Sequence, residues 1–229
     1  MTRESSPAMS TTDRHTAPDD LGDEAKFNGH RWFAAIFDTM SRAEERGFLG
    51  EMRGKLLADL TGDVLEIGAG TGANFAHYPT GVRVTALEPD PYMLEKAEAK
   101  LAALGRTDIV LQQAPAERLP FADAAFDTVI STLVLCTVRD VSRSLDEMHR
   151  VLRPGGELRF IEHVRGEGAV GHTQDIIKPI WGYFGAGCNP NRRTEDALRA
   201  AGFDPIVSER RKLMGFAPLI RGVAKTTAT

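Results

Sequence analysis

A glycine-rich segment, 63–74, constrains the fold of this 229-residue chain more than any other part of it. Val64, Leu65 and Ile67 form a short apolar run that is typical of a strand buried on both faces. Three glycines follow at alternate positions, Gly68, Gly70 and Gly72. Glycine permits positive φ angles and the close approach of a ligand to the main chain. Because 73–77 is compatible with a helix, the segment predicts a strand, a turn and a helix start that together bind a nucleotide.

The spacing of the glycines and two acidic residues narrow the choice of ligand. The pattern is G-x-G-x-G, whereas the fingerprint for dinucleotides and their pyrophosphate is G-x-G-x-x-G. Glu66 lies inside the motif, where its carboxylate would repel a pyrophosphate but suit an ammonium group. A second predicted strand, 82–87, leads into Glu88, and an acid at this point can accept hydrogen bonds from both hydroxyls of a ribose. A phosphate-free nucleoside with a cationic amino acid tail, S-adenosylmethionine, fits this pattern.

Four further motifs follow in order: Glu-Pro-Asp at 88–90, Leu-Pro-Phe at 119–121, Phe-Asp at 126–127 and Val-Leu-Arg-Pro-Gly-Gly at 151–156. With the glycine segment, they make the chain resemble the class I S-adenosylmethionine-dependent methyltransferases over about 31–224. The resemblance implies an α/β fold with a Rossmann-like, doubly wound, seven-stranded and mostly parallel sheet, N-terminal helices and an inserted lid segment. It also implies S-adenosyl-L-methionine as the cofactor.

The resemblance assigns the cofactor-binding residues. They are expected to be Glu66, Gly68, Gly70, Gly72, Asn74, Glu88, Pro89, Ala116, Glu117 and Thr132. In similar enzymes an aspartate often meets the adenine amine, but here Pro115 takes that place, and a proline side chain cannot accept a hydrogen bond. We therefore expect adenine to be recognised by the backbone N–H of Ala116, together with Glu117.

Composition limits the class of protein further. The formal net charge of −4 gives no basic footprint for nucleic acid. The sequence has neither an apolar run of about eighteen residues nor a signal-peptide core, so we expect a cytoplasmic protein without membrane spans. Cys136 and Cys188 are too few for a disulfide framework and lack metal-ligand spacing, so we expect free thiols and no metal site. A monomer or homodimer acting on a small molecule is the expected form.

The chain divides into a tail and one domain. Residues 1–25 are rich in Ser, Thr, Asp and Pro and have almost no apolar periodicity, which predicts a disordered tail. We expect a methyltransferase domain over 26–229, with N-terminal lid helices within 27–60 and an acceptor-site insertion at about 164–193. Strands and helices should alternate in between, and a reversed hairpin near 205–209 and 219–224 should close the sheet. The other predicted elements are strands at 109–112, 126–131 and 158–161 and helices at 92–104, 141–152 and 195–201.

The acceptor site is expected at the carboxyl end of the fourth strand, where ligands bind in open α/β sheets. Residues 132–136, 162–164 and 187–189, with Arg192 and Thr194, resemble the small-thiol methyltransferase branch (methyltransferase-like type 7 and bacterial relatives). That resemblance implies S-methylation of a small apolar thiol or dithiol. The candidate acceptor-binding residues are Phe37, Leu133, Cys136, Trp181, Cys188, Asn189 and Arg192.

His163 is the candidate catalytic base or thiolate partner, because it follows the fifth predicted strand and a thiol needs only modest help to ionise. A structural histidine that shapes the pocket is the alternative. Three other functions stay open: methylation at oxygen, nitrogen or carbon of a lipid-like, quinone-like or phenolic molecule, oxidoreduction with NAD, and cofactor binding without catalysis. The glycine spacing and Glu66 disfavour NAD, and the apolar acceptor segment favours an enzyme.

Overall fold

The structure is a computed structural model that describes residues 47–184, 188–213 and 217–227, with the backbone alone for 179–184. The predicted tail, 1–25, and most of the predicted lid region, with Phe37, lie outside the described residues. Of the lid region, the structure contains helix α2, Phe48–Leu57. The division into a tail, a lid and a domain therefore stays a prediction.

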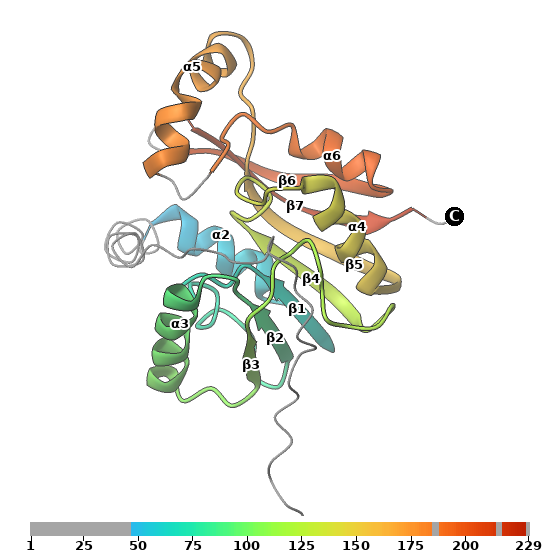
Figure 1. The fold of residues 1–229 in the computed structure, drawn as a ribbon. Coiled ribbons are helices and arrows are strands. Elements are labelled where there is room, and N and C mark those ends of the chain that lie inside the picture. The colour runs from blue at the N-terminus through green and yellow to red at the C-terminus, as the bar shows by residue number, and fades with distance from the viewer. Residues whose placement is uncertain (1–46, 185–187, 214–216, 228–229) are drawn as a thin grey trace, which may run out of the picture.

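Seven strands form one sheet in the order β3-β2-β1-β4-β5-β7-β6 (Figure 1). Strands β1 to β5 pair in parallel, whereas β7 pairs antiparallel with both β5 and β6. The predicted seven-stranded, mostly parallel sheet with a reversed C-terminal hairpin is confirmed. The strands are β1 (Asp63–Ile67), β2 (Arg83–Leu87), β3 (Ile109–Gln112), β4 (Phe126–Thr132), β5 (Leu152–His163), β6 (Phe203–Leu213) and β7 (Ala217–Thr226).

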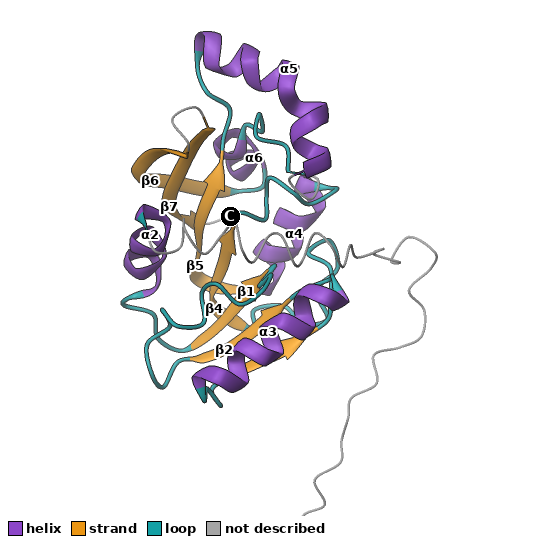
Figure 2. Ribbon diagram, turned by 90° about the vertical axis from the view of Figure 1, so that its left-hand side faces the viewer, coloured by secondary structure: helices purple, strands orange, loops and turns teal. Residues whose placement is uncertain are grey.

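Helices cover both faces of the sheet (Figures 1 and 2). Helices α2 and α3 (Pro91–Leu104) lie on one face, and α4 (Val141–Val151) and α6 (Thr194–Ala200) lie on the other. Helix α5 (Gly168–Phe184) follows β5 and projects beyond the sheet. None of the helices in the described ranges is both long enough and apolar enough to cross a membrane.

Neighbouring residues of the central strands point to opposite faces and enter separate hydrophobic clusters. Val64 and Ile130 belong to the cluster that includes α2, whereas Leu65 and Val129 belong to the cluster that includes α4 and α6. All four side chains are fully buried, as expected for parallel strands between two helical layers. This burial fixes the register of β1 and β4, and with it the position of the residues that follow them.

Helix α3 has clear start and stop signals. The side chain of Asp90 accepts hydrogen bonds from the N–H groups of Tyr92 and Met93, and Pro91 occupies the first turn, where no N–H is needed. Gly105 ends the helix with a φ of 63°. The cap at Asp90 fixes the chain directly after β2, which is where the sequence predicts a ribose-binding acid.

Two elements differ from the sequence predictions. Residues 70–77 form successive turns instead of a helix, with the N–H of Phe75 bonded to Gly72 and that of His77 to Asn74. These hydrogen bonds span three residues, so the chain tightens here instead of entering an α-helix. Strand β5 begins at Leu152 and not at 158, because Leu152 already pairs with Phe126 of β4, and a register shift then leads to the pairing of Glu157 with Thr128.

Candidate active site

The three glycines of the turn after β1 have different surroundings. Their φ angles are all positive, 65° at Gly68, 57° at Gly70 and 78° at Gly72. A Cβ at Gly68 would lie 2.6 Å from Val134, and one at Gly72 would lie 2.4 Å from Phe75. A Cβ at Gly70 would meet nothing within 4 Å. Gly68 and Gly72 therefore let the chain pack closely on itself, while Gly70 borders open space at the carboxyl edge of the sheet.

Glu88 lies beside Gly70 at the end of β2. The N–H of Gly70 donates to one carboxylate oxygen at 2.7 Å, and the N–H of Asp90 donates to the other at 2.9 Å. Burial raises the pKa of Glu88 to about 7, against the opposing effect of these two hydrogen bonds. Because a carboxylate offers about four acceptor positions, about two remain for the hydroxyl groups of a ligand.

Glu66 belongs to a buried polar network below the glycine turn. Its carboxylate accepts hydrogen bonds from Asn74 Nδ2 at 2.8 Å and from the Tyr78 hydroxyl at 2.9 Å. Asn74 also donates to Thr132 at 3.1 Å and accepts from Arg53 at 2.7 Å. Burial raises the pKa of Glu66 above its usual value, and the bonds from Asn74 and Tyr78 oppose this effect. The network ties the glycine turn to the end of β4, and the sequence analysis missed Arg53 and Tyr78 because neither stands in a motif.

The loop between β3 and β4 carries the two predicted adenine residues. Ala116 is buried, and the Glu117 carboxylate accepts the N–H of Arg139 at 3.0 Å and that of Asp140 at 3.4 Å. Glu117 therefore holds this loop against the start of α4. Adenine recognition by these residues stays a prediction, as does a cofactor contact by Pro89, which is half-buried after Glu88.

Glu162, near the end of β5, organises the loop after β4. Its carboxylate accepts the Ser131 hydroxyl at 2.7 Å and the N–H groups of three consecutive loop residues, Val134 at 3.0 Å, Leu135 at 3.0 Å and Cys136 at 3.2 Å. The side chain is fully buried, and burial raises its pKa to about 7. The sequence analysis included Glu162 only within the segment 162–164, because no local pattern shows which distant N–H groups a buried carboxylate will accept.

Two sulfurs and an imidazole meet next to this loop. Nδ1 of His163 lies 3.9 Å from Sγ of Cys136 and 3.7 Å from Sγ of Cys188, and both cysteines are free thiols. Nε2 of His163 is buried and has no hydrogen-bond partner among the described residues. Hydrogen bonding with Cys188, and then burial, raises the pKa of Cys136 well above its usual range. Cysteines that stand far apart in the sequence therefore share one site with the candidate catalytic histidine.

The segment that carries Cys188 is fixed to the loop after β4. The N–H of Asn189 donates to the carbonyl of Cys136 at 2.7 Å. The guanidinium of Arg192 donates to the carbonyls of Leu135 and Val138, and burial lowers its pKa. These contacts hold the two cysteine-bearing segments together through the main chain.

Most of the predicted acceptor-binding residues thus gather at the carboxyl ends of β4 and β5. The structure brings together Leu133, Cys136, Cys188, Asn189 and Arg192. Leu133 has a φ of 61°, and its N–H donates to Ile161 at 2.7 Å, which turns the chain out of β4. Phe37 and the side chain of Trp181 lie outside the described part of the chain.

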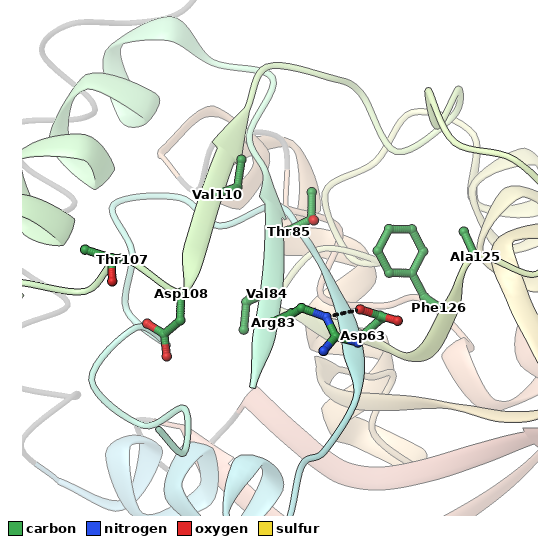
Figure 3. A pocket seen from close by; sticks show the side chains of 9 residues that line it. All are labelled: Asp63, Arg83, Val84, Thr85, Thr107, Asp108, Val110, Ala125 and Phe126. Atoms are coloured by element: carbon green, nitrogen blue, oxygen red, sulfur yellow. Dashed lines mark hydrogen bonds and ion pairs between the residues drawn. The ribbon is translucent and has the colours of Figure 1, made fainter. Parts of the chain in front are cut away.

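A surface hollow lies elsewhere on the molecule (Figure 3). Its lining comes mainly from the starts of β1 to β4 and includes the ion pair between Arg83 and Asp63 at 2.6 Å. Parallel strands start at the edge opposite the glycine turn, whereas ligands of open α/β sheets bind at the carboxyl edge. The hollow is therefore not part of the candidate active site.

Comparison with known proteins gives both sequence and structural relatives. Residues 65–160 match a family model described as a methyltransferase domain. The chain is 38% identical to human thiol S-methyltransferase TMT1B over 193 residues, which cover 80% of this chain and 78% of that protein. It is 35% identical to human thiol S-methyltransferase TMT1A over 185 residues, covering 76% and 73% of the two chains. A solved structure from Thermotoga maritima shares the fold with a TM-score of 0.65 at 23% identity, and the match covers 86% of this chain and 98% of that one. It is described as an S-adenosylmethionine-dependent methyltransferase and possible histamine N-methyltransferase.

Proposed function

The chain belongs to the thiol S-methyltransferase family of S-adenosylmethionine-dependent methyltransferases, and we propose that it methylates the sulfur of a small thiol or dithiol. The net charge of −4 supports a small molecule over a nucleic acid as the acceptor. The two cysteines are present as thiols and not as a disulfide, which supports a reducing, cytoplasmic location.

One contact carries the cofactor assignment: the N–H of Gly70 bonded to Glu88 at 2.7 Å beside open space. The remaining acceptor positions of the Glu88 carboxylate suit the two hydroxyls of a ribose. The buried acid Glu66, with Asn74 and Thr132, supplies the negative and polar groups that an ammonium-bearing tail needs. S-adenosylmethionine supplies a methyl group on a positively charged sulfur.

The surroundings of the acceptor site favour a thiol. Residues 133–136 are Leu-Val-Leu-Cys; Leu133 is half-buried and the other three side chains are buried, so the loop that leaves β4 makes the surroundings of the site apolar. The side chains of Cys188 and His163 meet it through the contacts with Cys136. Apolar surroundings of this kind bind a small apolar molecule better than a sugar or a strongly charged acceptor.

We assign activation of the acceptor sulfur to His163. Its Nε2 atom is buried without a partner in the described part of the chain, and such an unmade hydrogen bond costs about 1–3 kcal/mol. An acceptor that contacts His163 recovers this free energy. A thiol with a pKa near 8.5 needs only modest help to ionise. Much of the rate enhancement would then come from holding the acceptor sulfur in line with the methyl group of the cofactor.

A labelled-methyl assay tests the acceptor class. The full-length protein is incubated with methyl-labelled S-adenosylmethionine and matched panels of small apolar thiols, phenols and amines. Label should appear in thioethers, and the rate should fall at least about tenfold in His163→Ala. The exposed His172 of α5 provides the matched control, since His172→Ala should keep the rate of the unmodified protein. Transfer to phenols or amines alone would refute the thiol assignment and favour the alternative of oxygen or nitrogen methylation.

A further inference from the structure

Three ligand-type side chains converge from three separate segments of the chain. Cys136 belongs to the loop after β4, His163 ends β5, and Cys188 precedes α6. Their sulfur and nitrogen atoms all lie within 4.8 Å of one another, and all three residues are buried. The sequence analysis expected no metal site because it considered only spacing along the chain, which cannot show that residues on different strands and loops meet.

The distances suit a tetrahedral metal ion. With Zn–S of about 2.3 Å and Zn–N of about 2.0–2.1 Å, a tetrahedral centre separates sulfur from nitrogen by about 3.6 Å. Nδ1 of His163 lies 3.7 Å from Cys188 and 3.9 Å from Cys136. Small side-chain movements would therefore bring all three atoms to coordination distance.

Hydrogen bonding links the three groups, since Cys136 bonds with Cys188 and both sulfurs lie near Nδ1 of His163. A neutral imidazole nitrogen accepts one hydrogen bond, but two sulfurs face the same Nδ1 atom at nearly equal distances. Coordination through Nδ1 would place the imidazole proton on Nε2, which is buried and unpartnered among the described residues. A cation held by both thiolates and Nδ1 would use all three groups, and its charge of +2 would balance the two thiolates in a buried place.

The positions of the three ligands are set by contacts that need no metal. The N–H of Cys136 is bound by Glu162 at 3.2 Å, and its carbonyl accepts the N–H of Asn189 at 2.7 Å. The carbonyl of His163 accepts the Thr194 hydroxyl at 3.4 Å. The ligand set is therefore preorganised, which lowers the cost of binding an ion.

We propose that Cys136, His163 and Cys188 bind one Zn²⁺ ion and leave its fourth position for the sulfur of the acceptor. Two soft thiolates and an imidazole favour zinc over calcium or magnesium, and three protein ligands with an open position are typical of catalytic zinc sites. The metal site stands on its own geometry, whereas its role toward the acceptor rests on the proposed function. With the ion bound, His163 would activate the acceptor sulfur as a zinc ligand through Nδ1 and not by direct contact through Nε2.

The chemistry balances without a redox step. On binding, the acceptor thiol loses its proton to solvent and its sulfur replaces a water on zinc. The bound thiolate then attacks the methyl carbon, so that one S–C bond forms while the S–C bond to the sulfonium breaks. That electron pair stays on the departing sulfur, which becomes neutral. The product is an uncharged thioether, a poorer zinc ligand than a thiolate, so it leaves and water returns.

Metal analysis of the full-length protein, purified under reducing conditions and freed of any affinity tag, tests the site directly. We expect about one zinc per chain, and a loss to below about a tenth in Cys136→Ser, Cys188→Ser and His163→Ala. His172→Ala is the control and should keep its zinc. Calorimetry with S-adenosylhomocysteine shows whether each variant is still folded and able to bind the cofactor product.

Cobalt substitution gives a second measurement that needs no variant. Co²⁺ added to the metal-free protein should produce a thiolate-to-cobalt charge-transfer band and the visible bands of a tetrahedral ion. Addition of the acceptor thiol should strengthen the charge-transfer band, and addition of the methylated product should not.

Absence of both bound zinc and these bands would overturn the metal site. An intact mass that shows a disulfide between Cys136 and Cys188 in protein that was first reduced and then purified would also overturn it. Thiol methylation without metal would leave the proposed function in place, whereas bound zinc with transfer only to phenols would refute the function and leave the metal site.

Discussion

At the scale of single residues, two buried carboxylates of the cofactor edge have different tasks. Glu88 accepts main-chain N–H groups from Gly70 and Asp90 and still has free acceptor positions. Glu66 accepts hydrogen bonds from the side chains of Asn74 and Tyr78, so it fixes the glycine turn from its buried side. The difference in partners leaves Glu88 with acceptor positions for hydroxyl groups, whereas Glu66 contributes its negative charge from within an existing network.

The raised pKa of Glu88 predicts a pH dependence of cofactor binding. The ionised carboxylate accepts hydroxyl groups, and with a pKa of about 7 it becomes protonated as the pH falls. The affinity for S-adenosylhomocysteine should therefore decrease from about pH 8 to about pH 6, approaching tenfold per pH unit at the low end. Calorimetry across this range measures the slope.

Two variants separate this effect from other titrations. Glu88→Gln should bind more weakly at high pH and lose most of the slope, since it has no charge to lose. Glu98→Gln, at an exposed position of α3, should keep both the affinity and the slope. An unchanged slope in Glu88→Gln would show that another group titrates.

Gly70 borders the open space that we assign to the cofactor, so a side chain there should block binding. Gly70→Val places a β-branched residue at a φ of 57°, which should cost about 1–2 kcal/mol of stability and leave the fold intact. S-adenosylhomocysteine should no longer raise the melting temperature of this variant. Gly81→Val is a matched control, because Gly81 also has a positive φ, 86°, and open space but precedes β2 at the opposite edge. Retained binding in Gly70→Val would contradict the assignment.

The sequence could predict some of these residues but not others, for a physical reason. Glu88 follows an apolar strand and three glycines, so local pattern alone places it at the edge of the sheet. The contact of Cys136 and Cys188 with His163 depends on how α5 and the following segment return to β5. No periodicity or spacing along the chain encodes such a return.

At the scale of elements, the loop after β4 is the part whose structure depends most on a distant residue. Glu162 of β5 binds three consecutive N–H groups of this loop, a pattern similar to main-chain anion-binding turns. The apolar sequence of 133–136 predicts that the loop contacts the acceptor, but it does not reveal the carboxylate that shapes it. The turns at 70–77 differ from the predicted helix for a related reason, since Asn74 uses its side chain in the network below the turn.

Removal of the Glu162 carboxylate should destabilise the protein strongly. Glu162→Ala leaves three N–H groups and the Ser131 hydroxyl without their acceptor. Since each buried unpaired donor costs about 1–3 kcal/mol, the free energy of unfolding should fall by about 3 kcal/mol or more. Urea denaturation measures the loss, and Glu162→Gln, which keeps one acceptor oxygen, should lose less. An equal and small loss in both variants would mean that the loop does not depend on this carboxylate.

At the scale of the whole molecule, the sheet order brings the site together. Strands β2, β1, β4 and β5 are neighbours and all end at one edge, so Glu88, Gly70, Thr132 and His163 share that edge. The alternation of strands and helices predicted this arrangement, because parallel strands joined by crossovers end on the same side. It could not predict that β5 extends from Leu152, since the Pro-Gly-Gly stretch reads as a turn.

Because the proposed cofactor site spans several strand ends, its occupation should stabilise the whole fold. A ligand at about 100 times its dissociation constant adds about 2.7 kcal/mol to the free energy of unfolding. For a chain of this size, S-adenosylhomocysteine should then raise the melting temperature by about 5–10 °C. NAD at the same concentration should cause no shift, since its pyrophosphate would meet Glu66 and Glu88 and lack the G-x-G-x-x-G turn. Thermal unfolding with each ligand measures the two shifts in melting temperature. Stabilisation by NAD alone would contradict the methyltransferase assignment and indicate redox chemistry at this site.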